Sequence, residues 1–489
     1  MKLSALLAGM EILSRTAPDM EITGVAYDSR KVKPGYIFVA ISGFSTDGNR
    51  YIPKAMELGA AAVVTDVLPQ AEVPYILVPS ARMALAQLGA NWYGHPARKM
   101  TLIGVTGTNG KTSVTLLLKS VLERVTGRKV GLIGTIQNMI GEEIIPTERT
   151  TPESFELQGL LAAMAEAGCD YVAMEVSSHA LTLERVGGLY FRAAAFTNLT
   201  EDHLDFHETM EAYAEAKAKL FSRCDTGVFN MDDGYYPVML ESAKCRVMTC
   251  SERDESADLY AGHIRLEADH VEFMLRCDGR AHQVWVGIPG LFTAYNAMTV
   301  LGMAKALELP MDQAVEALRH TQGVKGRVEV VPTPGMDFTV LIDYAHTPDG
   351  LENVLRSVRA YCKGRTVAVF GCGGDRDRAK RPIMGAIGVR EADFVVFTSD
   401  NPRTENPDKI LEEIVAGARD SRTPWIVIEN RRQAIRYALD HGQKDDIIIL
   451  AGKGHETDQE ICGVKYHLDE REEVARWCAE NSGEGGMEK

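Results

Sequence analysis

Short apolar runs, separated by polar loops and amphipathic stretches, recur along the whole chain. Runs such as 101–105 and 193–196 have the length and composition of buried strands, and apolar residues at helical spacing follow several of them. A regular alternation of strands and helices is typical of mostly parallel sheets that are covered on both faces. The pattern therefore predicts an α/β fold.

Polar breaks divide the chain into three predicted domains. A chain of 489 residues is longer than one core usually supports. Residues 1–98 hold short strand-like runs around one helix-like stretch, 52–60, and 93–100 has the composition of a linker. Residues 99–331 alternate strand and helix, and the break at 332–335 precedes a second α/β pattern in 332–489. There, Asn406 and Pro407 are typical of a helix start.

Composition narrows the classes of function. The net charge of −15 argues against nucleic acid or an anionic membrane as the main partner. The nine cysteines include no C-x-x-C pair, which fits a reducing cytoplasm better than a disulfide framework or a zinc ribbon. The first 16 residues fit a short amphipathic helix rather than a signal peptide, and no run reaches the ~20 apolar residues of a membrane span. We expect a cytoplasmic protein without membrane insertion.

The clearest chemical motif is the glycine-rich loop between the run 101–105 and an amphipathic helix. Its glycines let backbone N–H groups face a phosphate chain at the positive end of that helix. Lys111 adds a full charge, and Thr112 places a hydroxyl where Mg²⁺ would bind. The longer P-loop pattern has glycine where this chain has Val105, but the strand–loop–helix context still predicts a nucleoside triphosphate site. The predicted site comprises Gly107, Thr108, Asn109, Gly110, Lys111, Thr112 and Ser113.

Polar residues also follow the next strand-like runs. Glu175 ends one run and His203 follows another, and together with Thr112 they offer oxygen and nitrogen ligands suited to Mg²⁺ beside phosphates. Lys217 lies in a helix whose apolar neighbours, among them Tyr213, direct it inward. A solvated acidic loop and a surface lysine are the simpler alternatives, although a carboxylate buried at the end of a strand is costly without a partner.

Seven segments together resemble the Mur ligases, the ATP-dependent enzymes of peptidoglycan assembly. They follow in family order across nearly the whole chain: GTNGKT, EVSSHAL, TNLTEDHLDFH, EAYAEAKAKLF, DYAHTPDGL, GCGGDRDRAKRP and AGKGHE. The resemblance implies a UDP-binding N-terminal domain, a central P-loop ATPase domain and a Rossmann-like C-terminal domain, in agreement with the three predicted regions. It also implies that a substrate carboxylate first forms an acyl phosphate with ATP, which the amine of an amino acid then attacks.

The same resemblance assigns the nucleotide and metal contacts. It implies that Lys111 acts on the transferring phosphoryl group and that Lys217, carbamylated by CO₂, binds a second Mg²⁺. Thr112, Glu175, His203 and the carbamate of Lys217 are the implied metal ligands, and Lys111, Lys217, His203 and Glu175 the implied catalytic residues. Asn296 and Arg327 are implied to contact the nucleotide and Asp343 its ribose, with His346 close by.

Within the family, the chain is similar to members that extend UDP-N-acetylmuramoyl-L-alanyl-D-glutamate. The segments DSR, 28–30, and TTPES, 150–154, carry this similarity. The implied contacts to uridine diphosphate are Asp28, Ser29, Phe44, Ser45 and Thr46, and those to the remainder of the substrate are Thr150, Thr151, Ser177 and Arg185. A glutamine contact of some members falls at Leu183, so that hydrogen bond is absent or replaced here.

The third substrate is predicted from polar residues that follow three strand-like runs of the C-terminal region. Arg403 and Arg376 present planar guanidinium groups suited to carboxylates, and Glu456 offers an acceptor for an ammonium group. This set suits meso-diaminopimelate, whereas the terminal ammonium of L-lysine would be repelled by Arg403. The motif DNPR is also that of diaminopimelate-adding members of the family. The alternative interpretation is that DNPR is an ordinary turn that caps the next helix. The predicted contacts are Arg376, Asp400, Asn401, Pro402, Arg403, Gly452 and Glu456.

Several alternative functions remain open at this point. Folylpolyglutamate synthetase shares the P-loop and the acyl-phosphate chemistry but has no UDP-binding domain like residues 1–98. The Mur ligase that adds D-alanyl-D-alanine has the architecture but no reason to keep DNPR, and an L-lysine-adding ligase would act at the same step. An ATPase that serves as a conformational switch would release phosphate without an amino-acid substrate. We expect a monomer whose substrates are ATP, the UDP-muramoyl-dipeptide and meso-diaminopimelate.

Overall fold

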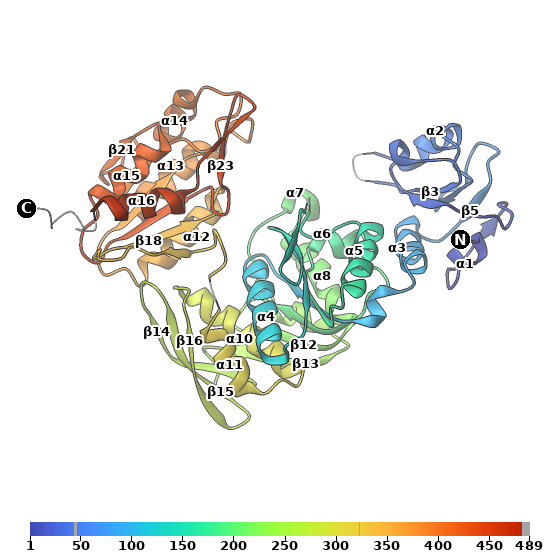
Figure 1. The fold of residues 1–489 in the computed structure, drawn as a ribbon, viewed down its shortest axis with the longest axis horizontal. Coiled ribbons are helices and arrows are strands. Elements are labelled where there is room, and N and C mark those ends of the chain that lie inside the picture. Colours follow the sequence, from blue (N-terminus) through green and yellow to red (C-terminus); the bar gives the residue numbers. More distant parts are fainter. Residues whose placement is uncertain (44–45, 148, 322, 482–489) are drawn as a thin grey trace, which may run out of the picture. The chain divides into compact units, whose positions relative to one another are not determined.

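The computed structural model describes residues 1–43, 46–147, 149–321 and 323–481 (Figure 1). The chain divides into two compact units, Met1–Tyr260 with Met298–Ala317 and Ala261–Ala297 with Leu318–Lys489. Three larger sheets and one two-stranded ribbon carry the described strands. Most strand pairs in the three larger sheets are parallel, so the predicted α/β class is confirmed.

The N-terminal sheet has the order β1-β5-β4-β3-β2, and only β1 runs antiparallel to its neighbour. Its strands are β1 Ser14–Arg15, β2 Gly24–Ala26, β3 Tyr36–Ala40, β4 Ala62–Thr65 and β5 Tyr75–Leu77. The helices are α1 Leu3–Leu6, α2 Ile52–Glu57 and α3 Ala81–Trp92, with 3₁₀ turns at Ser29–Lys31, Gly48–Tyr51 and Pro96–Lys99. The predicted helix-like stretch corresponds to α2. The twelve-residue α3 was not predicted, and the helix expected at the start spans only α1.

The central sheet has eleven strands in the order β16-β15-β14-β13-β12-β11-β6-β10-β7-β8-β9. Its strands are β6 Thr101–Thr106, β7 Val130–Ile133, β8 Asn138–Ile140, β9 Glu143–Ile145, β10 Tyr171–Glu175, β11 Phe191–Phe196, β12 Cys224–Asn230, β13 Arg246–Ser251, β14 Leu259–Leu266, β15 Val271–Cys277 and β16 Arg280–Val286. Its helices are α4 Lys111–Thr126, α5 Ser154–Glu166, α6 Ser178–Thr182, α7 Leu204–His207, α8 Met210–Ala218, α9 Tyr236–Glu241, α10 Leu291–Ala306 and α11 Met311–Arg319, and a 3₁₀ turn spans Lys219–Ser222.

The strand order of the central sheet places its functional loops. β6 lies between β10 and β11, and all three run parallel, so their carboxyl ends meet at one edge. The chain leaves β6 towards β7 and β10 on one side and reaches β11 and β12 on the other, which makes the end of β6 a point where the strand order reverses. Ligands of open parallel sheets bind at such points.

The C-terminal sheet has the order β17-β18-β22-β19-β20-β21, and only β17 is antiparallel to its neighbour. Its strands are β17 Glu329–Val331, β18 Thr339–Asp343, β19 Thr366–Phe370, β20 Phe394–Phe397, β21 Trp425–Val427 and β22 Ile447–Ala451, and the ribbon is β23 Asp458–Ile461 with β24 Val464–His467. Its helices are α12 Pro348–Arg359, α13 Lys380–Glu391, α14 Pro407–Ala416, α15 Arg431–Asp440 and α16 Glu470–Asn481. The five predicted strands are β18 to β22.

Alternate side chains of these buried strands pack on opposite faces. One face, with Leu341 and Phe370, packs against α12, α13 and α14 in one core cluster. The other face, with Ile342 and Val369, packs against α15 and α16 in a second cluster. Burying both faces explains why these strands are apolar throughout rather than alternating with polar residues.

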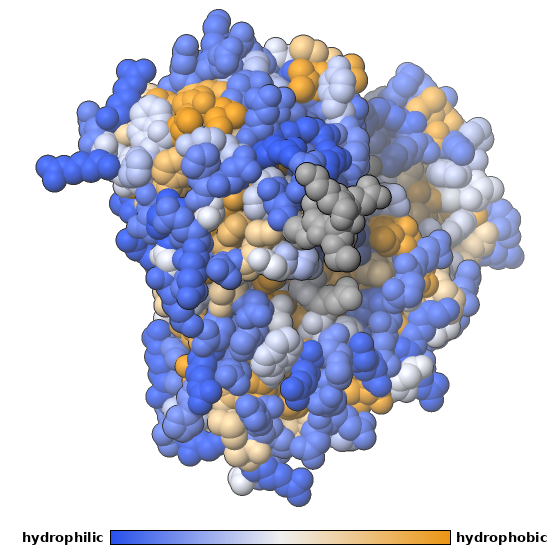
Figure 2. All heavy atoms as spheres, turned by 60° about the vertical axis from the view of Figure 1, so that its left-hand side comes forward, coloured by the Kyte–Doolittle hydropathy of each residue, from blue (hydrophilic) through white to orange (hydrophobic). Residues whose placement is uncertain are grey.

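The predicted domain limits remain a proposal. Because β17 pairs with β18, a C-terminal domain defined by its sheet would begin no later than Glu329 rather than at residue 332. No helix in the described part of the chain is long and apolar enough to cross a membrane. On the face seen in Figure 2, hydrophobic side chains are exposed in small groups between polar ones.

Candidate active site

The glycine-rich loop joins β6 to α4 as predicted. Gly107 has φ +143°, and a Cβ there would lie 1.9 Å from the hydroxyl oxygen of Thr197, so only glycine fits. The backbone N–H of Thr108 donates to Asn198 O (2.8 Å), and that of Asn109 donates to Asn198 Oδ1 (2.9 Å). The loop is thus tied to the segment after β11, and the helix N-terminus follows at Lys111.

Lys111 and Lys217 both reach the carbonyl of Gly107. Lys111 Nζ donates to Gly107 O (2.9 Å) and Thr108 O (2.7 Å), and Lys217 Nζ donates to Gly107 O (2.8 Å). The predicted inward position of Lys217 is confirmed, because only 1% of the residue is exposed. Burial, together with the positive charge of Lys111, holds the pKa of Lys217 well below its usual range. Both effects oppose the charged form of the Lys217 side chain.

Glu175 is the buried centre of a hydroxyl-rich cluster. Its Oε1 accepts from Thr112 Oγ1 (2.9 Å) and from the backbone N–H of Thr135 (2.9 Å), and its Oε2 accepts from Thr135 Oγ1 (2.9 Å). Two of the predicted metal ligands, Glu175 and Thr112, are therefore in direct contact. Thr135 was not predicted, since its place beside Glu175 depends on the pairing of β7 with β10.

Three histidine rings lie close together on the segments that follow β10 and β11. His203 is half exposed, and its ring contacts that of His179 edge-on at 4.8 Å between centroids. His207 is buried, and its Nε2 forms a 2.9 Å hydrogen bond with Ser178 Oγ. Burial and the nearby charges of His179 and Lys217 lower the pKa of His207 to about 4. No group of three or more His, Cys, Asp or Glu side chains arranged to hold a metal occurs among the described residues.

A second cluster of predicted nucleotide contacts lies in the unit that contains the C-terminal sheet. Asp343 is buried, and its carboxylate accepts the backbone N–H groups of Val328 and Ala345, both at 2.8 Å. Burial raises the pKa of Asp343, although the charge of Arg327 opposes the rise. Arg327 lies over the Tyr344 ring at 5.3 Å, and its buried Nε has no hydrogen-bond partner among the described residues.

The other two residues predicted to contact or lie near the nucleotide differ in their exposure to solvent. Asn296 is buried in α10, whereas His346 is exposed and its Nδ1 lies 2.8 Å from Tyr344 O. Both belong to the same unit as Asp343 and Arg327.

The residues predicted to bind the UDP-substrate fall into two groups, one in the N-terminal region and one in the central region. Asp28 caps the 3₁₀ turn Ser29–Lys31, and hydrogen bonds from Arg30 lower the pKa of its carboxyl. Thr46 is exposed, whereas Phe44 and Ser45 lie outside the described residues.

The other predicted contacts converge beside Glu175. Thr151 Oγ1 donates to Glu175 O (2.8 Å) and lies 3.4 Å from Ser177 Oγ, and Arg185 Nη1 donates to Thr151 O (3.2 Å). Thr150 Oγ1 lies 3.0 Å from Thr135 Oγ1. The predicted substrate contacts of the central domain thus lie near Glu175: Thr151 bonds its backbone carbonyl, and Thr150 is linked to its carboxylate through Thr135.

The residues predicted to bind the amino acid converge at the carboxyl edge of the C-terminal sheet. The strands β20, β19 and β22 are neighbours, so the loops that follow them meet. Arg403 Nη1 donates to Gly374 O (2.7 Å), and Asn401 Nδ2 donates to Glu456 Oε2 (2.8 Å). Arg376, in the loop after β19, is exposed, and its Nη1 donates to Asp375 O (3.2 Å). Gly452 has φ +114°, and a Cβ there would lie 2.6 Å from Asp400 Oδ2.

Comparisons with known proteins agree with this arrangement. The family model described as "Mur ligase middle domain" matches residues 105–304, "Mur ligase, glutamate ligase domain" matches 326–454, and "Mur ligase family, catalytic domain" matches 21–93. A protein of Caldanaerobacter subterraneus subsp. tengcongensis is 50% identical over 98% of this chain and 100% of its own. The chain belongs to the Mur ligase family.

Two further relatives of this Mur ligase are informative. A Clostridium acetobutylicum protein is 44% identical over 94% of this chain and 96% of its own. It and the Caldanaerobacter protein are both named UDP-N-acetylmuramoyl-L-alanyl-D-glutamate--2,6-diaminopimelate ligase, the former with the suffix 1. A solved structure with that name has a TM-score of 0.74, 31% identity and 99% coverage of both chains.

Buried charged residues of the Mur ligase brace the loops around Arg403 and were not predicted. Arg381 is fully buried and pairs with Glu405 and Glu413, and it also donates to Gly373 O (3.3 Å). Lys453 is fully buried between Asn401 and Glu456. Lysine and arginine are rarely buried, so nothing in the sequence indicated that Arg381 and Lys453 would lie in the interior.

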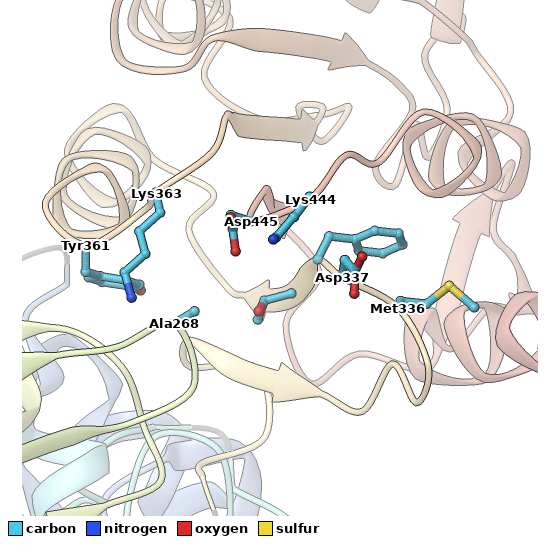
Figure 3. Close-up of a pocket in the computed structure, with 9 residues that line it drawn as sticks. Ala268, Met336, Asp337, Tyr361, Lys363, Lys444 and Asp445 are labelled. Carbon is cyan, nitrogen blue, oxygen red and sulfur yellow. The ribbon is translucent and has the colours of Figure 1, made fainter.

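The cavity shown in Figure 3 lies away from these residues. Its volume is about 300 Å³, and its lining includes Asp337, Tyr361, Lys363 and Asp445. Asp337 and Asp445 precede β18 and β22, so the cavity lies at the amino ends of these strands, opposite the edge where the predicted amino-acid contacts meet.

Proposed function

We propose that this Mur ligase adds meso-2,6-diaminopimelate to UDP-N-acetylmuramoyl-L-alanyl-D-glutamate, converting ATP to ADP and phosphate. The reaction belongs to the cytoplasmic synthesis of peptidoglycan precursors, and we propose that the enzyme acts as a monomer. The names of relatives that are 50% and 44% identical over nearly the full chain support the reaction. The observation that carries the substrate choice is the convergence of Arg403, Asn401 and Glu456 at one edge of the C-terminal sheet.

Activation of the carboxylate is assigned to the loop after β6. The γ-carboxylate of the D-glutamate residue attacks the γ-phosphate of ATP, and ADP leaves as the acyl phosphate forms. Such a transfer depends on positioning and on neutralising charge more than on covalent help from the protein. Backbone N–H groups at the start of α4 would hold the phosphates, and the Lys111 ammonium would turn from the carbonyls of Gly107 and Thr108 towards them.

The donor set around Glu175 fits Mg²⁺. The two members in direct contact are the Glu175 carboxylate and the Thr112 hydroxyl, both hard oxygen ligands, and the family resemblance adds the imidazole of His203. Bound there, Mg²⁺ would neutralise charge on the phosphates. Burial lowers the pKa of Lys217 and so favours the neutral amine that would attack CO₂, with loss of one proton, and the resulting carbamate would hold a second Mg²⁺.

The loops of the C-terminal sheet would orient the incoming amino acid. The guanidinium groups of Arg403 and Arg376 suit one end of meso-diaminopimelate, which carries a carboxylate where L-lysine has none. Glu456 suits an ammonium group. The free amine then attacks the acyl carbon, and phosphate leaves as the amide forms. Asp400, Pro402 and Gly452 shape the loops around these groups.

The remaining predicted contacts belong to the same proposal. We assign Asn296, Arg327, Asp343 and His346 to the nucleotide. Asp28, Ser29, Thr46 and the undescribed Phe44 and Ser45 are assigned to uridine diphosphate, and Thr150, Thr151, Ser177 and Arg185 to the rest of that substrate.

Steady-state turnover tests the reaction. ATP consumption and amide formation are measured with the UDP-muramoyl-dipeptide and either meso-diaminopimelate or L-lysine. We expect turnover with diaminopimelate and little with L-lysine. Comparable kcat/KM for the two amino acids would overturn the substrate choice, and phosphate release without either would favour the switch ATPase.

A separate experiment tests the carbamate. Lys217→Ala should be nearly inactive and partly rescued by formate or acetate, and carbon-labelled NMR of the wild-type protein should detect the adduct. Full activity of the variant without any additive would refute the role of Lys217, whichever amino acid is used.

A further inference from the structure

Lys453 is a fully buried cation next to the proposed diaminopimelate contacts. It follows β22, and its Nζ donates to Asn401 Oδ1 (3.2 Å), Glu456 Oε2 (2.9 Å) and Asp458 O (2.5 Å). An ammonium group has three hydrogens, and all three are used here. Because burying an ammonium is costly unless it is paired and hydrogen-bonded, this set of acceptors also fixes where the charge lies.

The orientation of Asn401 depends on Lys453. Asn401 Oδ1 accepts from Lys453 and from the backbone N–H of Glu460 (2.9 Å), whereas its Nδ2 donates to Glu456 Oε2 (2.8 Å). Turning the amide over would place its NH₂ group against two donors and its oxygen against a carboxylate. The amide therefore has one favourable orientation.

Glu456 is held by only one of its carboxylate oxygens. Oε2 takes both donors, Lys453 Nζ and Asn401 Nδ2, while Oε1 forms no hydrogen bond within the described part of the chain. The side chain is 31% exposed. One oxygen is thus anchored to buried groups, and the other remains available to a ligand.

We propose that Lys453 is a positioning residue for the amino-acid site. Its ammonium group, together with Asn401, holds Glu456 Oε2 so that Oε1 can accept the ammonium group of the incoming diaminopimelate. This inference rests on the proposed function, since it names the residue that orients one contact of that same site. Lys453 itself is too deeply buried to touch the substrate.

The chain offers a matched control for removing a buried lysine charge. Lys119 in α4 is 5% exposed, and its Nζ pairs with Glu123 (2.8 Å) and Glu142 (3.2 Å), in the other compact unit. Lys453→Met and Lys119→Met keep the length of the side chain and delete the ammonium group. Both are expected to lower stability, but only Lys453→Met should alter use of diaminopimelate.

The first measurement is the KM for meso-diaminopimelate at saturating ATP and UDP-muramoyl-dipeptide. We expect a rise of roughly 10- to 100-fold for Lys453→Met, the range for losing hydrogen bonds to a charged group, with little change in kcat or in KM for ATP. Lys119→Met should keep the wild-type KM. A folded Lys453→Met protein with an unchanged KM would overturn the inference, whereas a wild type that does not use diaminopimelate would refute the proposed function instead.

A double-mutant cycle with Glu456→Gln separates positioning from a general structural effect. If Lys453 acts through Glu456, adding Lys453→Met to Glu456→Gln should raise KM little further, whereas independent effects would multiply. Should Lys453→Met fail to fold, Asn401→Asp replaces it, because it keeps the acceptors for Lys453 and Glu460 while placing an anion against Glu456. That variant should raise KM in the same non-additive way, and a wild-type KM would overturn the inference.

Discussion

At the scale of single residues, burial and charge decide which side chains can act in the proposed chemistry. Lys111 and Lys217 both donate to the carbonyl of Gly107, but they differ in surroundings, because Lys217 is almost completely buried. The inward position of Lys217 followed from its apolar neighbours in the sequence. Its contact with the glycine-rich loop did not, since the two segments are more than 100 residues apart.

Lys111→Ala should abolish most amide formation and leave the fold intact. Lys111 acts on charge that develops in the transition state and supports no core, so the loss should be at least about 10²-fold in kcat. Turnover and the far-UV spectrum of wild type and variant measure this, with Lys219→Ala, an exposed lysine, as the control. A folded Lys111→Ala protein that keeps most of its turnover would contradict the assignment of the loop.

Arg403→Ala should raise the KM for diaminopimelate roughly 30- to 1,000-fold, the equivalent of about 2–4 kcal/mol for a partly buried arginine–carboxylate pair. The Arg403 side chain is 22% exposed, and Gly374 O and Glu460 already hold its guanidinium group in place. The KM for ATP should change less. Arg419→Ala, at an exposed position of the same domain, should leave all constants unchanged. An unaltered KM for Arg403→Ala would mean that DNPR is only a turn.

The stability of the wild type should fall as the pH drops from about 6.5 towards 4. The ordinary pKa of histidine is about 6.5, and burial lowers that of His207 to about 4. In this pH range the unfolded chain therefore binds a proton at His207 that the folded protein does not bind. The contribution of His207 to the free energy of unfolding is complete above pH 6.5 and is lost as the pH falls towards 4. Thermal unfolding at several pH values measures the slope. His207→Gln should show a shallower slope, and parallel curves would contradict the prediction.

At the scale of elements, local patterns located the strands well and some helices poorly. The runs that become β18 to β22 are apolar throughout, and the start of α14 shows its cap in sequence. Helix α3 was not predicted because small residues such as Ala84 and Gly89 occupy part of its buried face and make the apolar pattern weak, although Ser80 caps it. Its packing against Phe155 and other long-range neighbours decides it.

Asn406→Ala should destabilise the C-terminal domain by about 1 kcal/mol. Asn406 Oδ1 accepts the backbone N–H groups of Asp408 (2.8 Å) and Lys409 (3.3 Å), which have no partner inside the helix. The midpoint of denaturant unfolding measures the effect. Glu412→Ala, an exposed position inside α14, serves as the control and should shift the midpoint less. Equal shifts would show that the cap contributes nothing particular.

At the scale of the whole molecule, several separate hydrophobic cores stabilise the fold. Different clusters of buried residues stabilise the N-terminal, central and C-terminal sheets. Chains built in this way commonly unfold in several steps rather than as one cooperative unit.

Unfolding in urea should therefore not be two-state. Trp92 packs against the N-terminal core, Trp285 lies in β16, and Trp425 and Trp477 pack against the two faces of the C-terminal sheet. Tryptophan fluorescence should consequently follow a different curve from far-UV circular dichroism, which reports all domains together. Coincident curves with a single midpoint would contradict independent cores.

By itself, the sequence determined the features that depend on neighbouring residues: the α/β class, the loop after β6, the strands of the C-terminal sheet and the cap at Asn406. These depend on periodicity, on glycine conformation and on side chains within a few positions of one another. Only the tertiary structure decided which distant groups meet. The loops after β19, β20 and β22 join because those strands are neighbours in the sheet. Thr135 reaches Glu175, and Lys453 reaches Asn401, through long-range strand pairing of the same kind.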